Sequence, residues 1–130
     1  MRKKHWWILP ALAILVVLTL IALDERLILR TYTVTSPKLT AEVRLAVVTD
    51  FHSSDNADDV AAMTASCAPD AVLMVGDMFD DDTQNRPTER TLSLMRQLSA
   101  LYPCYYVSGN HEAWTGEMDA LYQQTEEAGV

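Results

Sequence analysis

Apolar and polar positions alternate along the chain in a pattern typical of α/β proteins. Three short apolar runs have the continuous hydrophobicity of strands that are buried on both faces. They are Arg44–Thr49, Ala71–Val75 and Tyr105–Val107. Each run is followed by a segment with apolar residues at helical spacing, at about residues 55–68, 87–102 and 116–128. This alternation predicts an α/β fold with a parallel sheet and right-handed crossover connections.

Helix-starting residues support these boundaries. Asp55 or Asn56 can cap the first helix, and Pro87 suits the start of the second. The polar segment from Asp80 to Pro87 separates the second strand from its helix. We expect this segment to be a solvated loop, because its acidic run lacks the alternating acids and the glycine of a calcium-binding loop.

The N-terminal part of the chain contains a long uncharged segment, Trp6–Leu23. Its length is about 18 residues, near the ~20 that a membrane-spanning helix needs. Basic residues at positions 2–4 would keep the N-terminus in the cytoplasm. The segment therefore predicts a single-pass membrane protein, with residues 6–23 in the lipid bilayer and the remainder outside the cytoplasm. A cleaved signal peptide fits less well, since Leu20 spoils the small-residue cleavage pattern, and a buried soluble helix would need a polar stripe.

The remainder of the chain divides into a linker and one domain. Residues 27–40 alternate polar and apolar side chains and predict an edge strand that Pro37 terminates. We expect a basic flank and anchor at residues 1–26, an edge strand and linker at 27–43, and the functional domain at 44–130. The domain is small for an α/β core, and the chain stops at a glycine that would hand over to another strand. The sequence therefore predicts a truncated domain.

Composition excludes several functions. Asp and Glu number 18 against 10 Lys and Arg, for a formal net charge of −8, which disfavours binding to nucleic acid. The 4 glycines do not form a dinucleotide-binding or P-loop pattern. Cys67 and Cys104 fall in separate apolar surroundings, so we expect two free thiols rather than a disulfide or a thiolate metal site.

A polar cluster follows each of the three predicted strands. In an open parallel sheet, ligands bind beyond the carboxyl ends of the strands. We therefore expect these clusters to bring five side chains to one edge, namely Asp50, His52, Asp77, Asn110 and His111. Their oxygen and imidazole donors suit divalent Mn, Fe, Zn or a similar ion.

The spacing of these residues fits a pair of metal ions. Asp50 and His52 point the same way on an extended segment, and Asp77 follows a glycine and could bridge two ions. Two cations ~3.5–4 Å apart can activate a water and stabilise the leaving oxygen in phosphoryl transfer. Glu112 could orient a histidine or could face solvent, and Trp114 could form a substrate wall or pack at the rim.

The motifs D-x-H, GD-x-x-D and GNHE, in this order, resemble those of the calcineurin-like metallophosphoesterase family, and within it the membrane-associated bacterial phosphohydrolases. The resemblance covers residues 44–130. It implies that these residues are the first half of a β-sandwich flanked by helices. It also implies a role for each residue that matches the family's motifs.

By this resemblance, Asp50 and His52 ligate a first metal, Asp77 bridges two metals and Asn110 ligates the second. His111 contacts the phosphate and protonates or stabilises the leaving group. Asp80 matches the second aspartate of GD-x-x-D, where a supporting role is expected. The implied reaction is hydrolysis of a phosphoester or pyrophosphate by a metal-bound hydroxide. The expected substrate is a phosphorylated small molecule or, because the domain would lie near the bilayer, a lipid-linked phosphate.

The sequence departs from the family in one respect. The family's pattern continues with a lone histidine and a G-H-x-H motif, which supply three further ligands, whereas this chain contains only His5, His52 and His111. The chain is therefore either a fragment or a degenerate relative. The alternative function is a non-catalytic, membrane-tethered module with a vestigial metal site.

Overall fold

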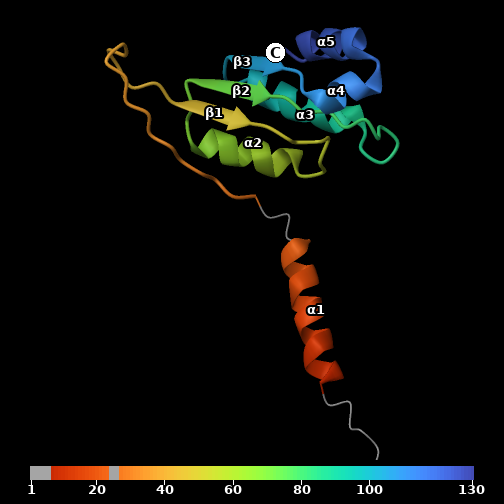
Figure 1. The fold of residues 1–130 in the computed structure, drawn as a ribbon. Coiled ribbons are helices and arrows are strands. Elements are labelled where there is room, and N and C mark those ends of the chain that lie inside the picture. The colour runs from red at the N-terminus through yellow and green to blue at the C-terminus, as the bar shows by residue number, and fades with distance from the viewer. Residues whose placement is uncertain (1–6, 24–26) are drawn as a thin grey trace, which may run out of the picture. The chain divides into compact units, whose positions relative to one another are not determined.

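The structure, a computed structural model, describes residues 7–23 and 27–130. Contacts divide the chain into two units, residues 1–31 and 32–130. The first unit contains helix α1 (Ile8–Ala22), and the second contains the sheet and the remaining helices (Figure 1). Each unit is described by itself.

Helix α1 is shorter than the apolar segment of the sequence. It has 15 residues, which at 1.5 Å per residue give about 22 Å, against the ~30 Å of a bilayer's hydrocarbon core. Trp7 and Leu23 lie outside the helix, and Trp6 and both charged flanks lie outside the described residues. Across residues 7–23 and 27–130, no helix has both the length and the apolar character needed to cross a membrane. The predictions of a transmembrane anchor and of a single-pass membrane location are therefore wrong.

The second unit is a small α/β domain built on a parallel sheet of three strands. The strands are β1 (Leu45–Val48), β2 (Ala71–Val75) and β3 (Cys104–Val107), in the order β1-β2-β3. Val48 pairs with Met74, and Val75 pairs with Val107, so the three strands end close to the same level. The three apolar runs of the sequence thus form the predicted parallel sheet.

Four helices belong to this domain. They are α2 (Ala57–Ser66), α3 (Thr88–Ser99), α4 (Asn110–Thr115) and α5 (Met118–Glu127). Asn56 and Pro87 occupy the N-cap positions of α2 and α3, as the sequence predicted. Helix α4 was not predicted, because six residues are too few to display helical periodicity.

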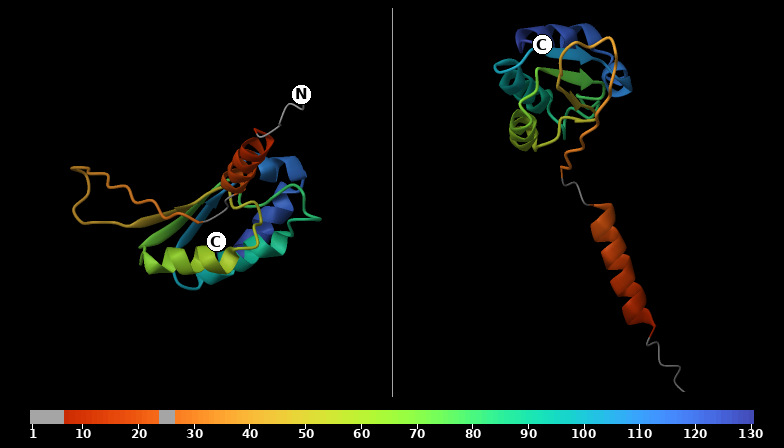
Figure 2. Two further views of the ribbon diagram at one scale, coloured as in Figure 1. Left: turned by 90° about the horizontal axis from the view of Figure 1, so that it is seen from below. Right: turned by 90° about the vertical axis from the view of Figure 1, so that its left-hand side faces the viewer.

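Burial alternates along the strands, and this alternation corrects one expectation. Val72 and Met74 are fully buried against the helices, whereas Val47 and Tyr105 point to the other face and are exposed. Helices α2 and α3 lie along one side of the sheet in the left view of Figure 2. The strands are therefore buried on one face, not on both.

The expected half of a β-sandwich is also wrong. The strands in the described part of the chain form one three-stranded parallel sheet, and residues 27–43 form no strand. Tyr32 and Val34, which produced the alternating pattern there, are both largely exposed. Alternation alone does not make a strand when no neighbouring strand is available to accept its hydrogen bonds.

Candidate metal centre

The segments that follow β1 and β2 remain bound to each other beyond the sheet. The Asp50 amide donates to the Gly76 carbonyl (3.2 Å), the His52 amide to the Asp77 carbonyl (3.0 Å) and the Ser53 amide to the Met78 carbonyl (3.0 Å). These bonds hold the two loops side by side directly after the strands end. Side chains separated by 25 residues or so in the sequence are thereby fixed next to each other.

The backbone turns sharply at the site residues. Asp50, His52, Ser53 and Asp77 have positive φ angles of 54°, 47°, 47° and 51°. Aspartate and histidine tolerate the left-handed region better than most residues, yet each such position costs about 1–3 kcal/mol and persists only where surrounding contacts compensate for this cost. The backbone bonds between the two loops are contacts of this kind.

Two glycines allow the ends of β2 and β3 to approach closely. A Cβ atom on Gly109 would lie 2.2 Å from Asp77 Oδ1 and 2.6 Å from the Asp77 amide nitrogen. A Cβ atom on Gly76, whose φ is +77°, would lie 3.1 Å from Gly109 Cα. Only a residue without a side chain at position 109 therefore allows Asp77 to sit against the end of β3.

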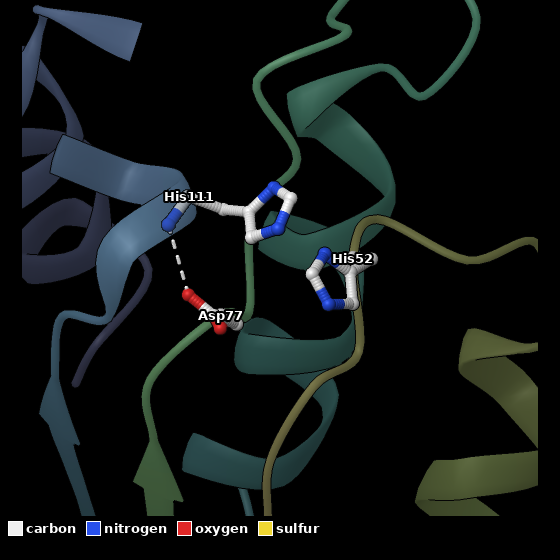
Figure 3. Close-up of side chains that lie close together, drawn as sticks. All are labelled: His52, Asp77 and His111. Atoms are coloured by element: carbon white, nitrogen blue, oxygen red, sulfur yellow. Dashed lines mark hydrogen bonds between the residues drawn. The ribbon is translucent and has the colours of Figure 1, made fainter. Parts of the chain in front are cut away.

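His52, Asp77 and His111 converge at this edge, and we call them the metal-site cluster. One donor atom from each lies within 4.8 Å of the other two. The two imidazole rings meet edge-on with centroids 4.3 Å apart, and Asp77 Oδ1 accepts the His111 backbone amide at 2.9 Å (Figure 3). The three side chains come from the ends of all three strands.

The donor set fits a divalent cation. Nitrogen and oxygen donors on one ion lie at 2.0–2.2 Å from it, so they are at most about 4.4 Å apart. The cluster therefore needs only a small adjustment to surround an ion. Two imidazole nitrogens and one carboxylate oxygen suit Zn, Fe or Mn.

Asp50 and Asn110 lie at the periphery of the cluster. Asp50 Oδ1 is 3.9 Å from His52 Nε2, and the Asp50 side chain is 63% exposed. Its Oδ2 accepts the Thr49 hydroxyl at 2.8 Å. Asn110 is exposed at the first residue of α4, directly before His111. The ligand roles expected for Asp50 and Asn110 remain predictions.

Two neighbouring aspartates each contact one imidazole of the cluster. Asp80 Oδ2 lies 3.5 Å from His52 Nδ1, and Asp81 Oδ1 lies 2.7 Å from His111 Nδ1. Asp80, Asp81 and His111 also form a second group of converging donor atoms. The sequence pattern did not identify Asp81, because its acidic run is typical of a solvated loop. The signal available was its position one residue after the GD-x-x-D motif, within side-chain reach of the site.

Glu112 is fully buried, and its carboxylate accepts hydrogen bonds from backbone amides. Its two carboxylate oxygens accept four N–H groups, those of Asp77 (3.0 Å), Met78 (2.7 Å), Phe79 (3.0 Å) and Gly109 (2.8 Å). It neither faces solvent nor orients a histidine, the two options left open by the sequence. Instead it connects the loop after β2 to Gly109, the residue that precedes α4, and so fixes the backbone of Asp77.

Two aromatic side chains border the site. Trp114 is exposed, and its ring centroid lies 4.7 Å from that of His111, so it lies at the rim. The Tyr106 hydroxyl is buried, with no hydrogen-bond partner in the described part of the chain. Burial, followed by the negative charge of Glu112, raises the pKa of Tyr106 well above its usual value.

The sequence also predicted the state of the two cysteines. Cys67 and Cys104 are both free and half-buried, which confirms two separate thiols. Burial raises the pKa of Cys104. These thiols therefore do not contribute to the site.

Comparison with known proteins supports the resemblance seen in the motifs. The family model for calcineurin-like phosphoesterases matches residues 43–128. An uncharacterized metallophosphoesterase of Campylobacter jejuni is 28% identical over 90 residues, which are 65% of this chain and 24% of that protein. The chain thus spans about a quarter of the length of that curated relative. No solved structure matches. The matches show the family as a whole. They do not show that the chain belongs to the membrane-associated bacterial members that the motifs suggested.

Proposed function

Since the chain belongs to the calcineurin-like phosphoesterase family, we propose that it carries part or all of the site of a divalent-metal-dependent hydrolase of phosphoesters or pyrophosphates. The observation that carries this proposal is the convergence of His52, Asp77 and His111 from the ends of three parallel strands. The substrate is a phosphorylated small molecule or a lipid-linked phosphate. The strongly acidic protein repels either anionic substrate at long range. Affinity must therefore arise at the site itself.

We assign the residues as follows. Asp50 and His52 would hold a first cation, Asp77 would bridge two cations, and Asn110 would hold the second. When bound, such ions lower the pKa of a water towards 7 and neutralise charge that develops on the phosphoryl oxygens. Asp77 suits the bridging position because Glu112 and the His111 amide fix its backbone and one of its oxygens.

His111 acts on the phosphoryl group in this proposal. Its Nδ1 lies 2.7 Å from an oxygen of Asp81, and a carboxylate can only accept, so Nδ1 carries the hydrogen of that bond. The other ring nitrogen, Nε2, is then left for the substrate. In the protonated ring, Asp81 stabilises the imidazolium while Nε2 donates its proton to the leaving oxygen. Asp80 performs the corresponding positioning of His52 from 3.5 Å.

The proposal is tested by hydrolysis of p-nitrophenyl phosphate with and without added Mn²⁺. We expect phosphate release only with the metal, loss of release with a chelator, and recovery when Mn²⁺ is restored. Hydrolysis that survives exhaustive chelation would contradict the mechanism. Saturable Mn²⁺ binding without turnover by a longer protein would instead support the non-catalytic alternative.

A further inference from the structure

Arg86 brings a positive charge to the edge of the metal-site cluster. Its Nη1 donates to the His52 carbonyl at 3.2 Å, and its Nε lies 3.7 Å from Asp80 Oδ2. The same Asp80 oxygen lies 3.5 Å from the His52 imidazole. Asp80 thus joins the guanidinium to the cluster, and Arg86 reaches the site from the loop before α3.

The loop holds Arg86 in a defined position. The Arg86 amide donates to the Asp82 carbonyl at 2.9 Å, and the Asp82 amide donates to Asp80 Oδ1 at 2.8 Å. The next residue, Pro87, is the N-cap of α3 and has a fixed φ. The side chain therefore extends from an ordered turn, which lowers the entropy that a ligand contact must overcome.

The guanidinium is only partly satisfied by these contacts. The Arg86 side chain is 47% exposed, whereas that of its partner Asp80 is 13% exposed. A guanidinium has five N–H donors, and the two contacts above engage only Nη1 and Nε. A planar fork of donors therefore remains accessible beside the cluster, in a geometry that matches two oxygens of a phosphate.

The other arginines of the domain each have partners of their own. Arg90 donates to the Ser53 carbonyl from a partly buried position. Arg96 pairs with Glu89 on α3, and Arg44 pairs with Glu42 and the Cys67 carbonyl at the opposite end of β1. The cluster is otherwise bordered by Asp50, Asp80 and Asp81, so the charge of Arg86 is the contribution that favours an anion there.

We propose that Arg86 contacts the non-bridging oxygens of the substrate's phosphoryl group and thereby makes dianionic phosphomonoesters the preferred substrate class. The positive charge of the Arg86 guanidinium adds more to the binding of a dianion than to that of a monoanionic diester, because Coulomb energy scales with charge. This inference rests on the proposed function, since it places the phosphoryl group at the metal-site cluster.

The test measures binding of two anions that the chain is not expected to cleave quickly. Methylphosphonate represents the dianionic monoester and dimethyl phosphate the monoanionic diester, each titrated calorimetrically into the Mn²⁺-loaded chain at pH 8.5. Arg86→Met should weaken methylphosphonate by about 10- to 100-fold, the range of a hydrogen bond to a charged group. It should weaken dimethyl phosphate only about 3- to 10-fold, because half the charge gives half the Coulomb energy. Arg86→Lys should restore part of the loss, and Arg96→Met, on the neighbouring helix α3, is the matched control.

The outcomes separate this inference from the proposed function. If Arg86→Met binds both anions as the wild type does, while the wild type binds Mn²⁺ and methylphosphonate, the role of Arg86 is refuted and the metal centre stands. If the Mn²⁺-loaded wild type binds neither anion, both proposals fail. A thermal unfolding midpoint unchanged in Arg86→Met confirms that a loss of binding is local.

Discussion

Asp81 Oδ1 lies 2.7 Å from His111 Nδ1, and this contact joins the loop after β2 to helix α4. It sets the hydrogen of the imidazole on Nδ1 and holds the ring beside His52. The acidic loop thus orients a side chain that the sequence motifs identified, although its own sequence is typical of solvent-exposed loops.

We expect Asp81→Asn to slow metal-dependent hydrolysis about 10- to 100-fold, the range seen when a partner that orients a site histidine is lost. The amide can present its N–H₂ group to Nδ1 and release the ring from its present tautomer. The measurement is kcat for p-nitrophenyl phosphate. Asp82→Asn removes the same charge from the same loop, where Asp82 contacts Asn85 rather than an imidazole. Equal effects of the two substitutions would show that only loop charge matters.

Gly109→Ala should weaken Mn²⁺ binding at least about tenfold, because its methyl group would overlap Asp77 Oδ1 and displace a carboxylate whose position the site requires. Isothermal titration with Mn²⁺ measures the effect. The control is Gly116→Ala, since a Cβ there meets no atom within 4 Å but has a φ of +73°. We expect the control to lose about 1 kcal/mol of stability and to keep its metal affinity. Unchanged Mn²⁺ affinity in Gly109→Ala would argue against Asp77 as a ligand.

Glu112→Gln should destabilise the domain by about 3 kcal/mol, because one side of the amide would place N–H₂ against two backbone donors that the carboxylate now accepts. Urea unfolding of the wild type and of Glu112→Gln measures this difference in the free energy of unfolding. Glu126→Gln is an exposed control on α5, for which we expect a change below about 0.5 kcal/mol. Similar stabilities for both variants would mean that the buried network contributes little.

The raised pKa of Tyr106 predicts that the domain loses stability at alkaline pH. Its folded-state pKa is raised above the unfolded value of 10.0, so above pH 10 the unfolded chain loses a proton that the native chain retains. The free energy of unfolding therefore falls as pH rises there, by up to about 1.4 kcal/mol per pH unit from this group. Tyr106→Phe should reduce this fall, while Tyr105→Phe, on the exposed face, should not. The prediction fails if the pH profiles of the two variants coincide.

Local sequence pattern was sufficient for the sheet and its neighbouring helices. The three apolar runs, each followed by apolar residues at helical spacing, identified the strands and helices. Helices α2 and α3 begin directly after Asn56 and Pro87, which the sequence indicated as starting residues. The strand-end motifs were also sufficient to place His52, Asp77 and His111 together, because parallel strands bring their carboxyl ends to one edge.

Features that depend on tertiary partners could not be obtained in this way. Tyr32 and Val34 belong to an alternating pattern typical of a strand but lack a neighbouring strand. Helix α1 ends at Ala22, before the apolar segment ends at Leu23. The buried position of Glu112 depends on amides from two separate segments. Asp81 and Arg86 belong to a loop whose sequence has no helical or strand periodicity. Such positions are set by long-range contacts rather than by local propensity.

The central claim is that the ends of the three strands bind divalent cations with Asp77 as the shared ligand, and Asp77→Asn tests it most directly. Asparagine tolerates the positive φ of Asp77 and can still accept the His111 amide, so the fold should persist. In a calorimetric titration with Mn²⁺, we expect saturable binding by the wild type and by the exposed-site control Asp59→Asn, and a loss of at least about 100-fold in Asp77→Asn. Mn²⁺ binding by Asp77→Asn with wild-type affinity and stoichiometry would contradict the account.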